Sequence, residues 1–366
     1  MAAASPLPDS LAEKLFGFCS SQIIFTALEL GVFDVLEESN LPLSSKAISE
    51  SISTNQDATE RLLDALVSMG FLKKTTSTTN PKYSNCPETK AFLLKNSNSS
   101  IHALMPMLRK SYTLFENLTS AIREGENQWG KTGFIARVFL YTMSLLNYLL
   151  GTSIDLFSFV YATKRGLLVF LEGLRGSSKL DAEGFVTAFD LTKYKRICDL
   201  GGATGDIAQA VNKHYPESKV TVFDLPKVIK CSTEFKNYKS NGSKNSIDWI
   251  GGDFFKDNLP ENDLFILTRI LQSFDATKID ILLARVYQQL PPGGGLLIGE
   301  KLLEDDKSGP LLGNISNLAM LVAGNKGARE RSGLEYQQIL QQQGFTKIQY
   351  KKTGGTFLDA IFACKE

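Results

Sequence analysis

The segment from residue 196 to residue 224 constrains the fold of this 366-residue chain more than any other. It begins with an apolar run at 196–200, which is typical of a buried strand, and continues through a glycine-rich turn at 201–205. A helical segment follows, and a second apolar run ends in Asp224. The order strand, glycine turn, helix, strand predicts the first crossover unit of a wound α/β sheet.

The polar residues of this segment indicate which ligand it binds. An acid that closes the second strand can accept hydrogen bonds from both hydroxyls of a ribose. The glycines Gly201, Gly202 and Gly205 do not follow the dinucleotide spacing G-x-G-x-x-G. Asp199, two residues before the turn, repels a pyrophosphate but can pair with an amino group. The segment therefore favours S-adenosylmethionine, a nucleoside that carries an amino acid, with NAD or FAD as the alternative.

The α/β rhythm continues after residue 224. Apolar runs at 247–250, 264–267 and 296–298 predict further strands, and the segment 275–290 predicts a helix between two of them. This alternation predicts a doubly wound, mostly parallel sheet, in which ligands bind at the carboxyl ends of the strands. The strand ends of this part of the chain carry polar residues: Asp224, Asp253, Arg269 and Glu300.

The first third of the chain predicts a separate, mostly helical module. Residues 11–38 carry an apolar stripe at helical spacing, with Gly31 as a stop signal. Residues 43–83 predict helix, turn, helix and a polar hairpin, which is the pattern of a winged helix. Arg61 is the single base of the second helix and acids surround it, whereas phosphate contacts need positive charge. A protein–protein role is favoured over DNA binding.

Composition excludes several classes of protein. The formal net charge is +1, so nothing indicates a nucleic-acid partner. Five scattered cysteines without a C-x-x-C motif, together with two histidines, indicate reduced thiols, a cytoplasmic location and no metal site. The N-terminus lacks the charged and apolar regions of a signal peptide.

Residues 134–150 form an apolar run in which Arg137 is the single charge. A membrane-spanning helix needs about 20 apolar residues, and this run is shorter. We expect a buried or subunit-contact helix and no membrane partner, with a helix on or across a membrane as the alternative.

Several strings, in order along the chain, resemble one family. They are VFDLP at 222–226, GGDFF at 251–255, LPPGGGLLIGEKLL at 290–303 and ARERSGLEYQQILQQQGF at 328–345. These strings resemble the small-molecule O-methyltransferases that use S-adenosylmethionine, in particular the acetylserotonin O-methyltransferases and their methyltransferase-like relative. The resemblance extends over nearly the whole chain. The run at 134–150 is the exception and looks like an insertion relative to the family.

The resemblance implies a fold, a cofactor and partners. It implies an α/β chain with a winged-helix-like dimerisation domain at 1–125, a helical connector at 126–190 and a Rossmann-like class I methyltransferase sheet at 191–366. It also implies a homodimer that binds S-adenosylmethionine and a small phenolic or indolic acceptor. The residues that it assigns to the cofactor are Tyr161, Gly201, Gly202, Asp224, Gly252, Asp253, Phe254 and Arg269. Strand-end or capping roles are the alternative for the two aspartates.

The chain departs from the family on the side where the acceptor binds. The family removes the acceptor's proton with a histidine in a run L-H-D-W, and here that run is LQSF at 271–274. Gln272 therefore stands at the histidine's position, and Ser273 replaces the acid that follows. An amide has no useful basicity near neutral pH. Ala319 and Ala323 stand where acetylserotonin enzymes hold the substrate with an asparagine and a glutamine.

Glu300 and Glu330 match the two acids that flank the histidine in the family. Without the histidine, we expect these catalytic-site acids to have little to orient, and ordinary strand-end and loop acids are the alternative. Two hypotheses follow. The protein is an acetylserotonin-type O-methyltransferase with a replaced base, or it is a cofactor-binding homologue that has lost or changed methyl transfer and acts through its dimer or partners.

Overall fold

The computed structural model describes residues 7–77, 80–131, 163–232 and 246–366. The chain folds as two compact units, Met1–Met105 and Pro106–Glu366. The division at residue 105 comes ahead of the boundary that we expect at 125. Tyr161 and the apolar run 134–150 lie outside the described residues.

The first unit is mostly helical. Its helices are α1 (Asp9–Leu15), α2 (Gly17–Leu30), α3 (Val32–Glu38), α4 (Ser45–Ser51), α5 (Gln56–Ser68), α6 (Pro87–Phe92) and the 3₁₀ turn η1 (His102–Leu104). An antiparallel sheet in the order β1-β3-β2 joins them, formed by β1 (Leu43–Ser44), β2 (Leu72–Lys74) and β3 (Lys82–Asn85).

Local sequence explains where these helices begin and end. Gly31 adopts the left-handed conformation, with φ of 75°, and ends α2 where the sequence predicts a stop. The side chain of Ser44 accepts a hydrogen bond from the N–H of Ala47 and caps α4, and Asn55 caps α5 through the N–H of Ala58. The predicted helix, turn, helix and hairpin are therefore present, and β1 is an added strand that pairs with the hairpin.

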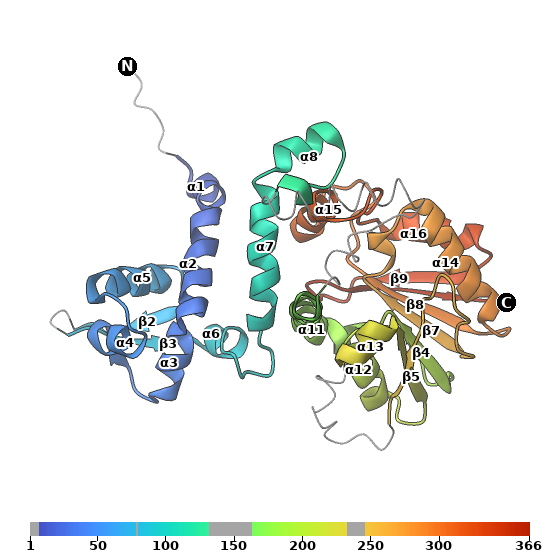
Figure 1. The fold of residues 1–366 in the computed structure, drawn as a ribbon, viewed down its shortest axis with the longest axis horizontal. Coiled ribbons are helices and arrows are strands. Elements are labelled where there is room, and N and C mark those ends of the chain that lie inside the picture. Colours follow the sequence, from blue (N-terminus) through green and yellow to red (C-terminus); the bar gives the residue numbers. More distant parts are fainter. Residues whose placement is uncertain (1–6, 78–79, 132–162, 233–245) are drawn as a thin grey trace. The chain divides into compact units, whose positions relative to one another are not determined.

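The second unit contains the large sheet and its helices (Figure 1). The helices are α7 (Met105–Phe115), α8 (Leu118–Glu124), α11 (Lys164–Val186), α12 (Asp206–His214), α13 (Pro226–Ser232), α14 (Ala276–Gln289), α15 (Leu311–Ala323) and α16 (Gly333–Gln342), with the 3₁₀ turns η2 (Trp129–Lys131) and η3 (Leu271–Ser273). The single helix that we expect over 101–125 is instead broken into η1, α7 and α8.

The sheet confirms the predicted wound topology. Its strands are β4 (Arg196–Leu200), β5 (Lys219–Asp224), β6 (Asp248–Gly251), β7 (Leu264–Thr268), β8 (Gly295–Glu300), β9 (Thr346–Lys351) and β10 (Asp359–Cys364). They follow the order β6-β5-β4-β7-β8-β10-β9, and β10 runs antiparallel to both of its neighbours. The strand order reverses direction at β4, so the turn after β4 lies at the switch point where such sheets bind ligands.

Helices cover both faces of this sheet (Figure 1). Because strand side chains alternate between faces, Cys198 and Leu200 pack into one core cluster, which also contains residues of α14 and α16. Ile197 packs into the other, together with residues of α11 and α12. Burial on both faces holds the strands rigidly and fixes the position of the polar residues at their carboxyl ends.

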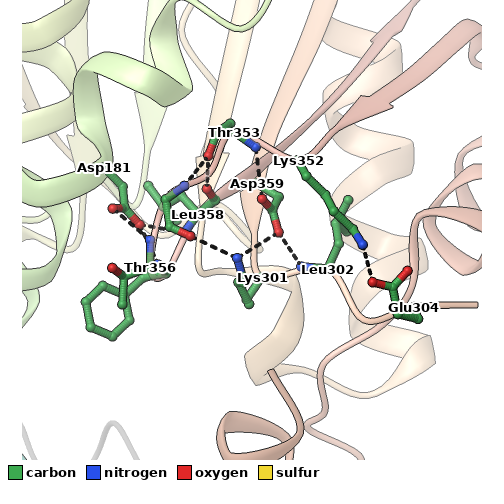
Figure 2. Close-up of polar contacts among 11 residues, drawn as sticks. Asp181, Lys301, Leu302, Glu304, Lys352, Thr353, Thr356, Leu358 and Asp359 are labelled. Carbon is green, nitrogen blue, oxygen red and sulfur yellow. Dashed lines mark hydrogen bonds and ion pairs between the residues drawn. The ribbon is translucent and has the colours of Figure 1, made fainter. Parts of the chain in front are cut away.

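Two buried carboxylates fix the loop between β9 and β10 (Figure 2). Asp359, which is 1% exposed, accepts hydrogen bonds from the N–H groups of Leu302 at 3.1 Å and Thr353 at 3.0 Å. The Lys301 ammonium lies 3.2 Å from the same carboxylate. Asp181 of α11 accepts hydrogen bonds from the backbone N–H groups at 356–358. The loop is thereby held to α11 and to the end of β8.

Among the described helices, none is both long enough and apolar enough to span a membrane by itself. Helices α2 and α3, which meet at a bend of 51°, pass the same test only as a pair. The described part of the chain also holds no cluster of three His, Cys, Asp or Glu residues placed to bind a metal ion.

The network in Figure 2 offers a matched test of buried and exposed ion pairs. We expect Asp359→Asn to lower the free energy of unfolding by about 3–5 kcal/mol, because it leaves Lys301 without its buried partner. Glu304→Gln removes the exposed pair with Lys352 and should cost less than about 1 kcal/mol. Urea unfolding of both variants measures the difference. Equal losses would contradict a structural role for Asp359.

Candidate active site

The glycine turn after β4 is shaped by close contacts within the protein. Gly201 has a φ of 74° and donates its N–H to the carbonyl of Phe223 at 2.7 Å. A Cβ on Gly202 would lie 2.6 Å from Asp199 Oδ2, and a Cβ on Gly252 would lie 2.4 Å from the Phe223 ring. Larger residues would therefore displace the turn and the end of β5, so the glycines have a packing role whatever the ligand.

Asp199 is a fully buried acid beside this turn. Among the described residues, no donor meets either of its carboxylate oxygens with hydrogen-bonding geometry. Burial raises the pKa of Asp199 to about 7, and the nearby charges of Asp224 and Asp206 add to the rise. The nearby N–H of Ala208 lowers the pKa against these causes, although it does not meet the carboxylate with hydrogen-bonding geometry. An unpaired, buried carboxylate of this kind would gain most from a positively charged partner.

Asp224 closes β5 next to the same turn. Its Oδ2 accepts the N–H of Ala203 at 2.9 Å, and its Oδ1 accepts the N–H of Leu225 at 2.7 Å. Burial raises its pKa to about 6, and these two N–H groups counteract the rise. Each oxygen keeps a second lone pair, so the carboxylate can accept further hydrogen bonds while the backbone holds it in place.

Asp253 and Phe254 follow the end of β6. Oδ1 of Asp253 accepts the N–H of Phe255 at 2.9 Å, and Lys256 lies 3.2 Å from its Oδ2. Phe254 packs edge to face against Phe255 and Phe274. The structure thus gives Asp253 a turn-capping role, which is the alternative that the sequence leaves open.

Arg269 directly follows β7 and adopts a left-handed conformation, with φ of 56°. Its Nη1 donates to the hydroxyl of buried Ser177 at 2.9 Å, and its guanidinium carbon lies 5.8 Å from the centre of the Phe357 ring. Phe357 belongs to the β9–β10 loop that Asp181 holds. Arg269 is therefore positioned by α11 and by that loop, and the sequence alone does not indicate this arrangement.

From the sequence we expect Glu300 and Glu330 to have little to orient without a histidine. That expectation is wrong, because Gln272 lies between the two acids and bonds to both. The amide orientation follows from its neighbours. With its nitrogen directed at the acids, Gln272 donates to both carboxylate oxygens of Glu330, at 2.8 and 3.0 Å, and to Glu300 Oε2 at 3.1 Å. All three side chains are at most 4% exposed. One neutral amide thus joins two buried carboxylates.

The two acids also have separate anchors. Oε1 of Glu300 accepts the N–H groups of Leu271 at 2.8 Å and Gln272 at 3.3 Å. Burial raises the pKa of Glu300, and the charge of Glu330 adds to the rise. Burial also raises the pKa of Glu330, against a hydrogen bond from Ser316 and the positive charge of Arg269. Because both acids are buried and the charge of Glu330 acts on Glu300, ionisation of both at once is disfavoured.

The remaining expected residues lie on two elements. Ser273 is half-buried in η3, and its carbonyl accepts a hydrogen bond from Asn325 at 3.3 Å. Ala319 and Ala323 are both half-buried on α15, and the carbonyl of Ala323 accepts the indole N–H of Trp129 at 2.8 Å. Ser316, one turn earlier on α15, bonds to Glu330 and was missed because a lone serine in a helix carries no signal.

The buried acid of β4 yields a pH prediction. A carboxyl with a raised pKa makes the folded state bind its proton more tightly than the unfolded state does. Its contribution to stability is therefore lost as pH rises from about 4 to about 7. We expect Asp199→Asn to stabilise the ligand-free protein by about 2–4 kcal/mol near pH 8 and by little near pH 4. Urea unfolding at both pH values measures this, and a gain that does not depend on pH would contradict it.

Comparisons with known proteins identify the family. Residues 115–346 match an O-methyltransferase domain, and residues 12–95 match an O-methyltransferase dimerisation domain. The acetylserotonin O-methyltransferase of Macaca mulatta is 38% identical over 97% of each chain, and that of Homo sapiens is 36% identical over 95% of each chain. The crystal structure of human N-acetylserotonin methyltransferase in complex with SAM matches at a TM-score of 0.86, with 35% identity over 100% of this chain and 99% of that one.

The matches agree with the geometry. The O-methyltransferase match contains most of the wound sheet, the dimerisation match lies within the helical first unit, and the structural similarity extends along the whole chain. The chain therefore belongs to the O-methyltransferase family and carries that family's dimerisation domain.

Proposed function

We propose that this protein is an S-adenosylmethionine-dependent O-methyltransferase of the acetylserotonin type, which methylates a hydroxyindole or another small phenolic hydroxyl. It acts as a homodimer, because it carries the dimerisation domain of the family. Its five cysteines are free, in keeping with the cytoplasm. The observation that carries the proposal is the unpaired, buried carboxylate of Asp199 at the switch point of the sheet.

The residues present fit the cofactor. When bound, S-adenosylmethionine supplies an electrophilic methyl group and a positive charge. Asp199 offers a buried negative charge to the amino group, and Asp224 offers its remaining lone pairs to the ribose hydroxyls. The glycine turn places backbone beside both acids, because Gly202 lies against Asp199 and the N–H of Ala203 donates to Asp224. Gly252, Asp253, Phe254 and Arg269 are the further cofactor-side residues of the proposal, together with Tyr161 from the family resemblance.

The acceptor side lacks the family's usual base. Gln272 cannot take a proton near neutral pH, and a positioned general base contributes about 10²–10⁴ in rate. Glu300 and Glu330 nevertheless hold Gln272 in place, so the acceptor side remains an ordered site. The second candidate is a homologue that binds the cofactor without efficient transfer and acts through its dimer or partners. The small side chains of Ala319 and Ala323 favour it, because they cannot hold the substrate as an asparagine and a glutamine do.

The ribose assignment has its own test. We expect Asp224→Ala to weaken S-adenosylmethionine binding by about tenfold or more, because hydrogen bonds to a charged acceptor contribute about 1.5–3 kcal/mol. Asp253→Ala is the matched control. Its carboxylate already caps a turn and pairs with Lys256, so it should cause a smaller loss. Calorimetry measures both affinities. An Asp224→Ala variant that binds as tightly as the wild type would refute the assignment.

Methyl transfer to N-acetylserotonin and to a panel of phenols tests the activity itself. The double substitution Gln272→His with Ser273→Asp then separates the two candidates. A histidine at 272 would lie between Glu300 and Glu330, which are already positioned to orient it. For an O-methyltransferase we expect product from the wild type and a gain of up to about 10²–10⁴ in kcat from the double variant. Cofactor binding without product from either protein would favour the second candidate.

A further inference from the structure

The carboxylate of Glu330 has a second side-chain partner besides Gln272. The hydroxyl of Ser316 donates to Glu330 Oε1 at 2.6 Å, a short hydrogen bond of the kind that a charged acceptor makes. The side chain of Asn317, next along α15, accepts the N–H of Glu330 at 3.0 Å. Two consecutive residues of α15 therefore hold Glu330 through its side chain and its backbone.

Ser316 connects this buried acid to the expected acceptor side. Glu330 is 2% exposed, whereas Ser316 is half-buried. Residues three, four and seven positions apart share one face of a helix, so Ser316 lies on the same face of α15 as Ala319 and Ala323. Those two alanines stand where relatives hold the substrate. A hydroxyl on the acceptor-side face of α15 thus touches a buried carboxylate.

We propose that Ser316 and Glu330 together take the place of the missing histidine, as a proton relay from the acceptor hydroxyl to a buried carboxylate. The proposal rests on the O-methyltransferase function proposed above. In it, the acceptor hydroxyl donates to Ser316 Oγ, Ser316 donates to Glu330 Oε1, and Gln272 and Glu300 are positioning residues that hold Glu330.

The step balances without a further reactant. The acceptor oxygen forms a bond to the methyl carbon as the bond between that carbon and sulfur breaks, and the electron pair of the broken bond stays on sulfur. The proton of the acceptor passes to Ser316 Oγ while the original Ser316 proton passes to Glu330. After product release, Glu330 returns this proton to solvent through the same hydroxyl. The net change is one methyl group transferred and one proton released.

The surroundings of Glu330 suit a proton acceptor that must recover. Burial raises its pKa toward the working pH, where general bases are most effective. The hydrogen bond from Ser316 and the positive charges of Arg269, Arg331 and Lys301 oppose that rise. The charged and titratable groups around the pair are Arg269, Glu300, Lys301, Arg331 and the phenol of Tyr336.

The test compares Ser316→Ala, which removes the hydroxyl, with Ser316→Thr, which keeps it. Single-turnover methyl transfer is measured with phenols of graded acidity. We expect Ser316→Ala to slow transfer by about 10–10²-fold for weakly acidic phenols and by little for phenols already ionised at the assay pH. Ser316→Thr should retain most of the rate. The affinity for S-adenosylmethionine, measured by calorimetry, should be the same in all three proteins.

A second measurement does not depend on turnover. The Ser316 hydrogen bond lowers the pKa of Glu330, so its loss should move the carboxyl titration of the ligand-free protein to higher pH. Infrared difference spectra of the protonated carboxyl band across pH measure this in the wild type and in Ser316→Ala. Ser316→Thr is the control.

The outcomes separate the relay from the underlying activity. Selective loss with weakly acidic phenols, together with a shifted carboxyl titration, supports the relay. If the wild type is active and Ser316→Ala loses the same factor in transfer rate for every phenol, or loses none, the relay is overturned. The methyltransferase function is then unaffected. A wild type that binds the cofactor and methylates no phenol overturns both.

Discussion

Burying a carboxylate away from water costs several kcal/mol unless a partner compensates for the lost hydration. This sheet buries a carboxylate at three of its strand ends. Asp199, Asp224 and Glu300 end or nearly end β4, β5 and β8, and all three are at most 9% exposed. The doubly covered strands keep these three groups almost entirely out of contact with water in the ligand-free protein. The function of the second unit follows from how each acid is compensated.

Each acid finds a different solution. Asp224 uses two backbone N–H groups, Glu300 uses two backbone N–H groups and the Gln272 amide, and Asp199 meets no donor with hydrogen-bonding geometry in the described chain. An acid without compensation lowers the stability of the free protein and is the strongest indication of a cationic ligand. Asp199, beside the glycine turn, is therefore the residue at which the free protein loses stability and a bound cation would restore it.

Much of the fold could be predicted from residue patterns. Apolar runs ending in polar residues located β4, β5, β7 and β8, because buried parallel strands leave this pattern wherever they occur. The break between α7 and α8 and the short strand β1 were missed, since both depend on tertiary packing and pairing rather than on local sequence. The packing role of Gly202 and Gly252 was also invisible, because it depends on which side chains lie opposite.

The residues of the site could be predicted from the sequence, but the hydrogen bonds between them could not. Motif comparison placed Gln272, Glu300 and Glu330 together, yet it treated the glutamine as a loss because only its missing basicity is evident in the sequence. The contact of one amide with two acids is evident only in the three-dimensional structure, since residues 272, 300 and 330 come from three separate segments. Ser316 is a similar case, because its role depends on a partner 14 residues away.

The amide of Gln272 has one further consequence. An imidazole at this position would gain and lose a charge during each turnover, and the acids around it would respond each time. A carboxamide keeps the same donors and zero charge from acidic to alkaline solution. Glu300 and Glu330 are therefore joined by a group whose charge does not change with pH. Any ionisation observed among these three side chains belongs to the two carboxyl groups.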